Sequence, residues 1–134
     1  MIPLVCIYIG GILTLLLAIF HTQFYRLFTW ADDLNKITIP NQKILYTIHL
    51  ALLLIFFMIG ILSIAYGKEL SQSIGLSFGF NLFYSFFWIW RLIWQFLYFK
   101  KAKGKSIPPI GIFLIFLFAL LSVAYLVPVL YRIL

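Results

Sequence analysis

Apolar residues fall into four long stretches separated by short, more polar segments, and this pattern predicts four membrane-spanning helices. The stretches are Leu4–Leu27, Ile44–Tyr66, Ile74–Phe99 and Ile110–Tyr131. A helix needs roughly 20 apolar residues to cross the ~30 Å hydrocarbon core of a bilayer. Because the connections are short, we expect consecutive helices to be antiparallel neighbours. The sequence therefore predicts an all-α fold, a four-helix transmembrane bundle formed by one domain over residues 1–134.

The third stretch differs from the others because polar and amphipathic side chains recur along it at alternating spacings of four and three residues. They are Ser77, Asn81, Tyr84, Trp88, Arg91, Gln95 and Tyr98. This spacing places every one of them on a single face of a helix. A polar group that faces lipid has no water to bond, so we expect this polar stripe to face protein or a water-filled cavity.

Composition supports a membrane protein. Hydrophobic residues make up 65% of the chain and charged residues 10%. A soluble domain of this length has too little interior to bury so much apolar surface. The first stretch is interpreted as a membrane span and not as a cleaved signal peptide, because no basic residue precedes it and it is too long. The single cysteine, Cys6, excludes an internal disulfide.

The net charge of +7 is better explained by membrane orientation than by nucleic-acid binding. The segments that follow the first and third stretches carry seven basic residues, and the opposite side carries two. The seven are Arg26, Lys36, Lys43, Lys100, Lys101, Lys103 and Lys105, and the two are Lys68 and Arg132. Cytoplasmic loops are enriched in Lys and Arg. We therefore expect an integral, multi-pass protein with both termini outside the cytoplasm, and no nucleic-acid partner.

A small-residue motif, Gly75 to Gly79, lies at the start of the third stretch. Small residues four positions apart allow two helix backbones to approach closely within lipid. We interpret the motif as a packing contact inside the bundle. A homo-oligomer or another membrane-protein partner that docks through Gly75 and Gly79 is the alternative.

Three ionisable residues fall inside the apolar stretches at similar depth, namely His21, His49 and Arg91, and Gln95 lies one helical turn from Arg91. An ionisable residue inside a membrane is costly, so a functional role is the default hypothesis. The competing interpretation is that Arg91 extends to the membrane surface and the histidines are structural. If the four side chains meet, they form a site in the cytoplasmic leaflet.

Such a site favours a lipophilic anion or a lipid head group. The guanidinium of Arg91 suits phosphate or carboxylate, and we assign ligand binding to His21, His49, Asn81, Tyr84, Trp88, Arg91 and Gln95. A bare metal ion is disfavoured by the lack of a carboxylate in the stretches, whereas haem ligated by the two histidines stays possible. The leading prediction is a non-enzymatic lipid-binding protein or accessory subunit. A redox enzyme (haem- or quinone-linked) or a lipid-modifying enzyme that uses both histidines is the alternative.

A short pattern in the first half of the chain resembles small four-helix bacterial inner-membrane proteins of unknown function. The pattern is His21, Phe24 and Trp30, followed by the pair Asn41 and Gln42. The resemblance implies the four-span architecture and the bacterial inner membrane. It implies no activity, and no site residue is transferred from it.

Overall fold

The protein is all-helical in the computed structural model, which describes residues 1–98 and 107–134. Four long helices are joined by segments that include three short ones, and the described residues contain no strand. The long helices are α1 (Ile2–Thr22), α4 (Ile39–Ala65), α6 (Leu76–Tyr98) and α7 (Pro109–Ile133). The short helices are α2 (Phe24–Leu27), α3 (Trp30–Leu34) and α5 (Gly67–Gln72). The all-α prediction is confirmed.

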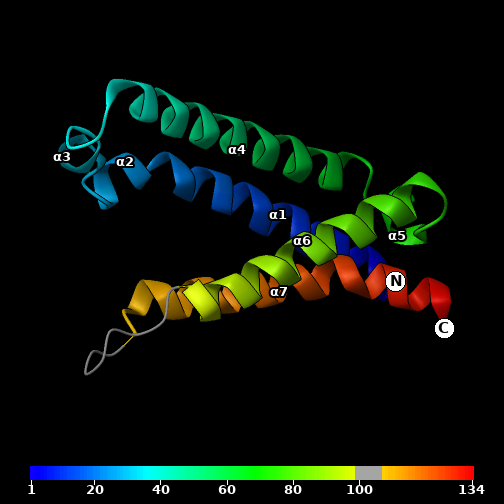
Figure 1. Ribbon diagram of the computed structural model, residues 1–134. Helices are drawn as coiled ribbons and strands as arrows, with labels where there is room; N and C mark the ends of the chain where they lie inside the picture. The colour runs from blue at the N-terminus through cyan, green and yellow to red at the C-terminus, as the bar shows by residue number, and fades with distance from the viewer. Residues whose placement is uncertain (99–106) are drawn as a thin grey trace.

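The long helices form two pairs, α1 with α4 and α6 with α7 (Figure 1). The pairs meet near the two chain termini and α5, which we call the closed end. They diverge toward α2 and α3, which we call the open end. Helix α1 packs on α7 and on α5, whereas α4 packs mainly on α1. The arrangement is therefore two helix pairs joined at one end, and the predicted four-helix transmembrane bundle is not confirmed.

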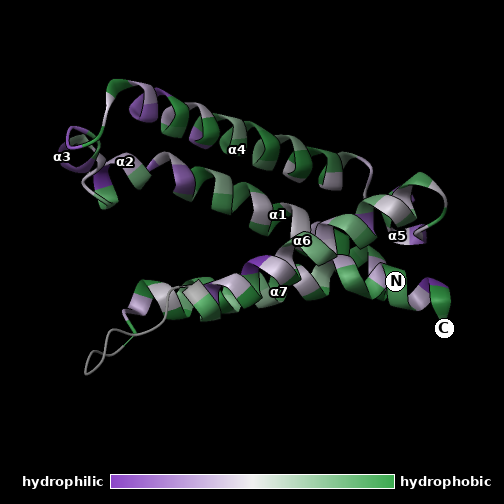
Figure 2. Ribbon diagram, in the orientation of Figure 1, coloured by the Kyte–Doolittle hydropathy of each residue, from purple (hydrophilic) through white to green (hydrophobic). Residues whose placement is uncertain are grey.

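Three of the long helices, α1, α4 and α7, are long and apolar enough to cross a membrane. Helix α6 has 23 residues, which is long enough, but the residues of its polar stripe make it less apolar than the others. Figure 2 shows apolar residues dominating the long helices and polar residues gathered at α3 and α5. The four-span prediction is thus met by three helices among the described residues, and the crossing of α6 stays a prediction.

The helix boundaries differ from the predicted ones where local geometry intervenes. The first stretch breaks at Gln23, so that its last turn forms α2. Helix α4 begins at Ile39, five residues before the predicted start, because Pro40 is well accommodated in a first helical turn. Residues 67–72, expected as part of a turn, form α5. The lysines at 100, 101, 103 and 105 lie outside the described residues.

At the closed end, glycines bring α1 and α4 into close contact. A Cβ added to Gly11 would lie 2.9 Å from Cβ of Ser63 and 3.2 Å from the carbonyl oxygen of Gly60. A Cβ added to Gly60 would lie 3.1 Å from the carbonyl oxygen of Gly11. Gly10 contacts α7 in the same way, since its added Cβ would lie 2.8 Å from the ring of Tyr125. Backbones therefore approach each other here more closely than any larger residue permits.

The predicted packing motif, in contrast, faces open space in the part of the chain that the structure describes. An added Cβ on Gly75 or Gly79 meets nothing within 4 Å among the described residues. Gly75 has a φ of +55°, a conformation that glycine adopts readily. The prediction of a packing contact inside the bundle is wrong, because Gly10, Gly11 and Gly60 provide it instead. A homo-oligomer contact through Gly75 and Gly79 stays a prediction.

Candidate functional site

The polar stripe of α6 faces the interior of the molecule. Asn81, Tyr84, Trp88 and Gln95 are buried, and Arg91 is partly buried. The opposite face of α6 carries exposed apolar residues, which include Leu82, Phe83 and Phe86. The predicted direction of the stripe is therefore confirmed for these five residues, whereas the side chain of Tyr98 lies outside the described residues.

At the closed end, the stripe holds the connection between α5 and α6. The amide Nδ2 of Asn81 donates a hydrogen bond to the carbonyl oxygen of Leu70 at 2.7 Å and a longer one to Oγ of Ser73 at 3.4 Å. Ser77 Oγ accepts from the backbone N–H of Ile74 at 2.9 Å and donates to its carbonyl oxygen. Ser73 itself has a φ of +52°. Asn81 and Ser77 thus satisfy backbone groups at a sharp reversal of the chain, and this accounts for their presence.

The middle of the stripe enters a buried polar cluster to which all four long helices contribute. The hydroxyls of Ser63 (α4) and Tyr125 (α7) are hydrogen-bonded at 2.7 Å. The rings of Tyr84 (α6) and Tyr125 make an edge-to-face contact with centroids 4.6 Å apart. Thr14 (α1) and Trp88 flank the Tyr84 hydroxyl, but neither meets the geometry of a hydrogen bond, so this hydroxyl and Trp88 Nε1 lack a described partner. This cluster joins the two helix pairs.

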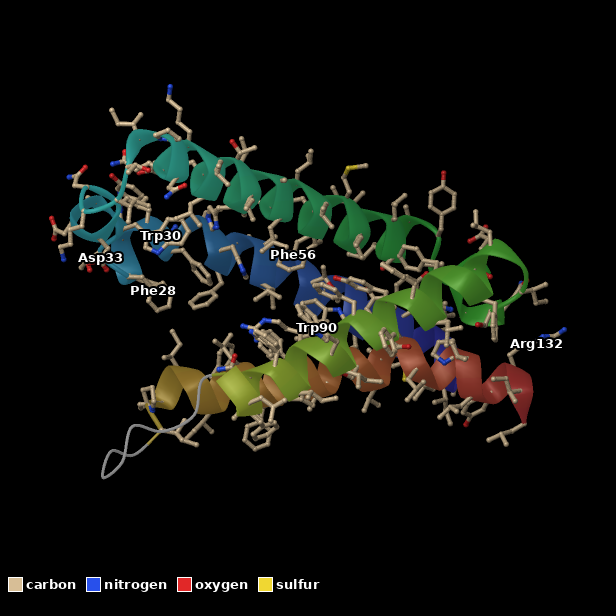
Figure 3. The ribbon with its side chains drawn as sticks, in the orientation of Figure 1. Phe28, Trp30, Asp33, Phe56, Trp90 and Arg132 are labelled. Carbon is tan, nitrogen blue, oxygen red and sulfur yellow. The ribbon has the colours of Figure 1, made fainter. Side chains whose placement is uncertain are left out.

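Toward the open end, a cavity of about 270 Å³ lies between the two helix pairs. Figure 3 shows Phe56 of α4 and Trp90 of α6 on facing sides of this region. Its lining combines residues from α1, α2 and α4 with residues from α6 and α7: Leu17, His21, Phe24, Leu52, Phe56, Phe87, Trp88, Trp90, Arg91, Leu114 and Phe118. The cavity therefore brings together His21 and Arg91, two of the three ionisable residues that the sequence singled out.

His21 is fixed within the cavity wall by its own helix. Its Nδ1 lies 2.9 Å from the carbonyl oxygen of Leu17, one turn earlier. Phe24 stacks on the imidazole at a centroid distance of 4.1 Å, and Phe56 meets it edge-on at 5.2 Å. These contacts set the orientation of the ring before any ligand arrives.

His49 lies beside His21 but does not line the cavity. The two imidazole centroids are 6.0 Å apart, and Trp30 makes an edge-to-face contact with His49 at 4.9 Å. A haem between the two histidines would need an open plane for its macrocycle. The rings of Phe24, Phe56 and Trp30 already pack against the two imidazoles, so these residues do not fit haem.

Arg91 is held toward the cavity by partners on α6 and α7. Its Nη1 donates to Oε1 of Gln95 at 3.0 Å, and its guanidinium carbon lies 4.7 Å above the ring of Phe118. This cation–π contact and the hydrogen bond orient the charge. Both Arg91 and His49 lie within electrostatic range of His21. Arg91 is therefore not simply a side chain that extends to the membrane surface.

The acidic residues of the chain lie in short helices and not in the long ones. The three acids of the chain are Asp32 and Asp33 in α3 and Glu69 in α5. Asp33 forms a surface ion pair with Lys36 at 3.0 Å. Among the described residues, no group of three or more His, Cys, Asp or Glu side chains is placed to hold a metal ion.

Sequence reasoning missed the position of Phe118, whose ring lies beneath the guanidinium of Arg91. The chain has 15 phenylalanines, and spacing alone does not distinguish those that line a cavity from those that face lipid. A second cavity, about 420 Å³, lies at the closed end among mostly apolar residues of α4, α5 and α6. It contains no residue of the His21 and Arg91 group.

Comparison of this chain with protein families, curated proteins and solved structures gave no match. The resemblance to small bacterial inner-membrane proteins therefore stays an expectation.

Proposed function

We propose that the protein is an integral membrane protein that binds a lipophilic anion, such as the head group of an acidic lipid, in the cavity between its two helix pairs. The observation that carries this proposal is the placement of Arg91. Its guanidinium is oriented by Gln95 and Phe118 at the wall of a largely apolar cavity. On the other helix pair, His21 lines the same cavity.

The energetics favour an anion as the ligand. An arginine at the centre of a membrane helix costs about 2.5–3.5 kcal/mol on the insertion scale. Gln95 and Phe118 orient the guanidinium at the cavity wall. A phosphate or carboxylate suits it as a ligand, because the rigid guanidinium can bond two oxygens of one anion at once.

The size of the cavity restricts what part of the ligand enters. Small-molecule sites in proteins measure about 300–1,000 Å³, and this cavity, at about 270 Å³, lies just below that range. It suits a head group with a short length of attached chain. The rest of a lipid would extend between the diverging pairs into the bilayer, against residues such as Phe87 and Leu114 that also line the cavity.

The predicted orientation places this site in the cytoplasmic leaflet. Arg26, Lys36 and Lys43 lie at the open end, and Lys68 and Arg132 lie at the closed end. The first group marks the cytoplasmic side under the positive-inside rule. These surface cations also attract anionic lipids, at about 1 kcal/mol per charge, and so raise their concentration near the cavity.

Native mass spectrometry of the protein purified in a mild detergent tests this function. We expect the wild-type protein to retain acidic lipid, and Arg91→Gln to lower its affinity by about tenfold, since a hydrogen bond to a charged group contributes about 1.5–3 kcal/mol. Arg132→Gln is the matched control, because it removes a cation at the closed end. Equal lipid retention by both variants would contradict the proposal.

The same preparation addresses the alternatives. A protein partner that co-purifies in fixed ratio, with no bound lipid, would favour an accessory subunit. A visible absorption band would favour a redox cofactor, and release of a modified lipid on incubation would favour an enzyme that uses His21.

A further inference from the structure

The two polar groups of the cavity have opposite hydrogen-bonding capacities. A guanidinium has five N–H donors and no acceptor, so Arg91 can only donate. The remaining donors among the lining side chains are the indole N–H groups of Trp88 and Trp90. All other lining residues apart from His21 are Leu or Phe. His21 is therefore the one lining side chain that can accept a hydrogen bond from a ligand.

The hydrogen bond to Leu17 determines which nitrogen of His21 accepts. A backbone carbonyl oxygen has no proton, so the Nδ1 that lies 2.9 Å from it must be the donor. In the neutral imidazole, Nε2 is then unprotonated and carries the lone pair. Histidines that bind a partner through one ring nitrogen commonly donate the N–H of the other to a backbone carbonyl, as Nδ1 of His21 does here.

A ligand that satisfies both sides of the cavity needs two kinds of oxygen. One must accept from Arg91, and the other must carry a proton for Nε2 of His21. A phosphodiester or a sulfonate satisfies Arg91 alone, because it has no O–H. A buried acceptor without a partner costs about 1–3 kcal/mol, so ligands that lack the O–H bind less well.

We propose that the ligand is a lipid phosphomonoester, whose monoanion carries a negative charge and keeps one O–H, bound through Arg91 to an acceptor oxygen and through Nε2 of His21 to the O–H. This inference rests on the proposed function and adds the ligand class. His49 does not contact the ligand in this proposal, because its ring stacks beside that of His21 and does not line the cavity.

The decisive comparison uses two lipids that differ in one group. Phosphatidic acid is a phosphomonoester with an ionisable O–H, and phosphatidylmethanol is a diester with the same acyl chains and no O–H. Binding of each to the detergent-purified protein is measured by native mass spectrometry at equal concentrations. We expect the wild-type protein to prefer phosphatidic acid by about tenfold, the ratio that corresponds to one hydrogen bond of ~1.4 kcal/mol.

Variants assign the preference to His21. His21→Phe keeps an aromatic ring among Phe24 and Phe56 but removes the acceptor, so the ratio should fall to about one. His49→Phe, the matched control in the neighbouring ring, should keep the wild-type ratio. His21→Gln restores an acceptor oxygen and should recover part of it. If the ratio in His21→Phe stays at tenfold, the extra charge of the monoester explains the preference and the inference is overturned.

The outcomes separate this inference from the function on which it rests. If wild-type protein binds both lipids equally and Arg91→Gln weakens both, the anion site stands and the O–H requirement fails. If neither lipid binds, the proposed function fails. Tighter binding of a long-chain fatty acid than of phosphatidic acid would also overturn the inference, because an ionised carboxylate has no O–H to donate to His21. If His21→Phe does not fold, a wild-type ratio of one contradicts the inference, and so does a tenfold ratio that persists in His21→Leu, which also lacks the acceptor.

Discussion

The closed end and the open end of this molecule are built by different kinds of contact. At the closed end, Gly11 and Gly60 allow the backbones of α1 and α4 to touch, and Ser63 and Tyr125 exchange a hydrogen bond across the helix pairs. At the open end, aromatic side chains span the distance between the pairs, as in the stacking of Phe56 on Trp88 at 5.6 Å. The closed end fixes the helices through backbone contacts, and the open end leaves the cavity that His21 and Arg91 line.

The difference shows how one set of helices can serve both stability and binding. In lipid, helix association depends on close van der Waals packing and on hydrogen bonds. In this protein the glycine contacts and the hydrogen bond between Ser63 and Tyr125 both lie at the closed end. Long side chains at the other end contact each other without bringing backbones together. A largely apolar cavity can then form beside Arg91 without weakening the contact that joins the pairs.

The largest expected effect concerns the side of the membrane on which each end lies. In a Cys6→Ala background, we expect Lys68→Cys at the closed end to react with a membrane-impermeant thiol reagent in intact cells. Lys36→Cys at the open end should react only after permeabilisation, because the basic end is predicted to be cytoplasmic. Both side chains are exposed, so access to the reagent is not limited by the fold.

Labelling of Lys36→Cys in intact cells would reverse the orientation. Labelling of both positions in intact cells would place both ends on one side, which contradicts a membrane-crossing arrangement of the long helices.

A smaller effect is expected on stability, where one substitution at two glycines distinguishes the closed end from an open surface. Gly11→Ala should lower the free energy of unfolding by about 1–3 kcal/mol, because its Cβ would collide with Ser63 and with the backbone of Gly60. Gly79→Ala meets no neighbour and should be neutral or stabilise by up to about 1 kcal/mol. Thermal unfolding in detergent measures both. A loss of stability in Gly79→Ala would instead indicate that this face is covered, as in a homo-oligomer.

The smallest expected effect is a loss of stability when a hydroxyl is removed from the buried polar cluster that joins the two helix pairs. Tyr125→Phe removes the hydrogen bond to Ser63 and should destabilise by about 0.6 kcal/mol, the average for side-chain hydrogen bonds within membranes. Tyr84→Phe removes a buried hydroxyl that has no described partner and should leave the melting temperature unchanged. Equal losses in the two variants would show that the Tyr84 hydroxyl has a partner, such as Thr14 or a bound water molecule.

The sequence predicted the helical architecture and the direction of the polar stripe, because both follow from local periodicity. The length of each apolar stretch predicts a helix, and the spacing of the polar residues from Asn81 to Gln95 predicts that they share one face of it. Sequence did not predict which glycines pack. Gly75 and Gly79 match a known spacing, whereas Gly11 and Gly60 lie on different helices, and only the tertiary arrangement brings them together.

The candidate site was predicted in part for the same reason. Depth along each helix placed His21, His49 and Arg91 at one level. Depth does not give rotation about the helix axis, so it could not show that His21 lines the cavity and His49 does not. Nor could it show that Arg91 lies above Phe118, since that contact depends on how α6 and α7 cross.

The divergence of the two helix pairs also bears on the shape of the surrounding membrane (Figure 1). In a bilayer that the long helices cross, the protein occupies a smaller cross-section at the closed end than at the open end. The leaflet around the open end must therefore accommodate a wider inclusion than the opposite leaflet does. Such a wedge favours curvature in which the leaflet at the open end is convex, so the contacts of Tyr125 with Gly10 and Ser63, which join the two pairs at the closed end, influence membrane bending as well as helix packing.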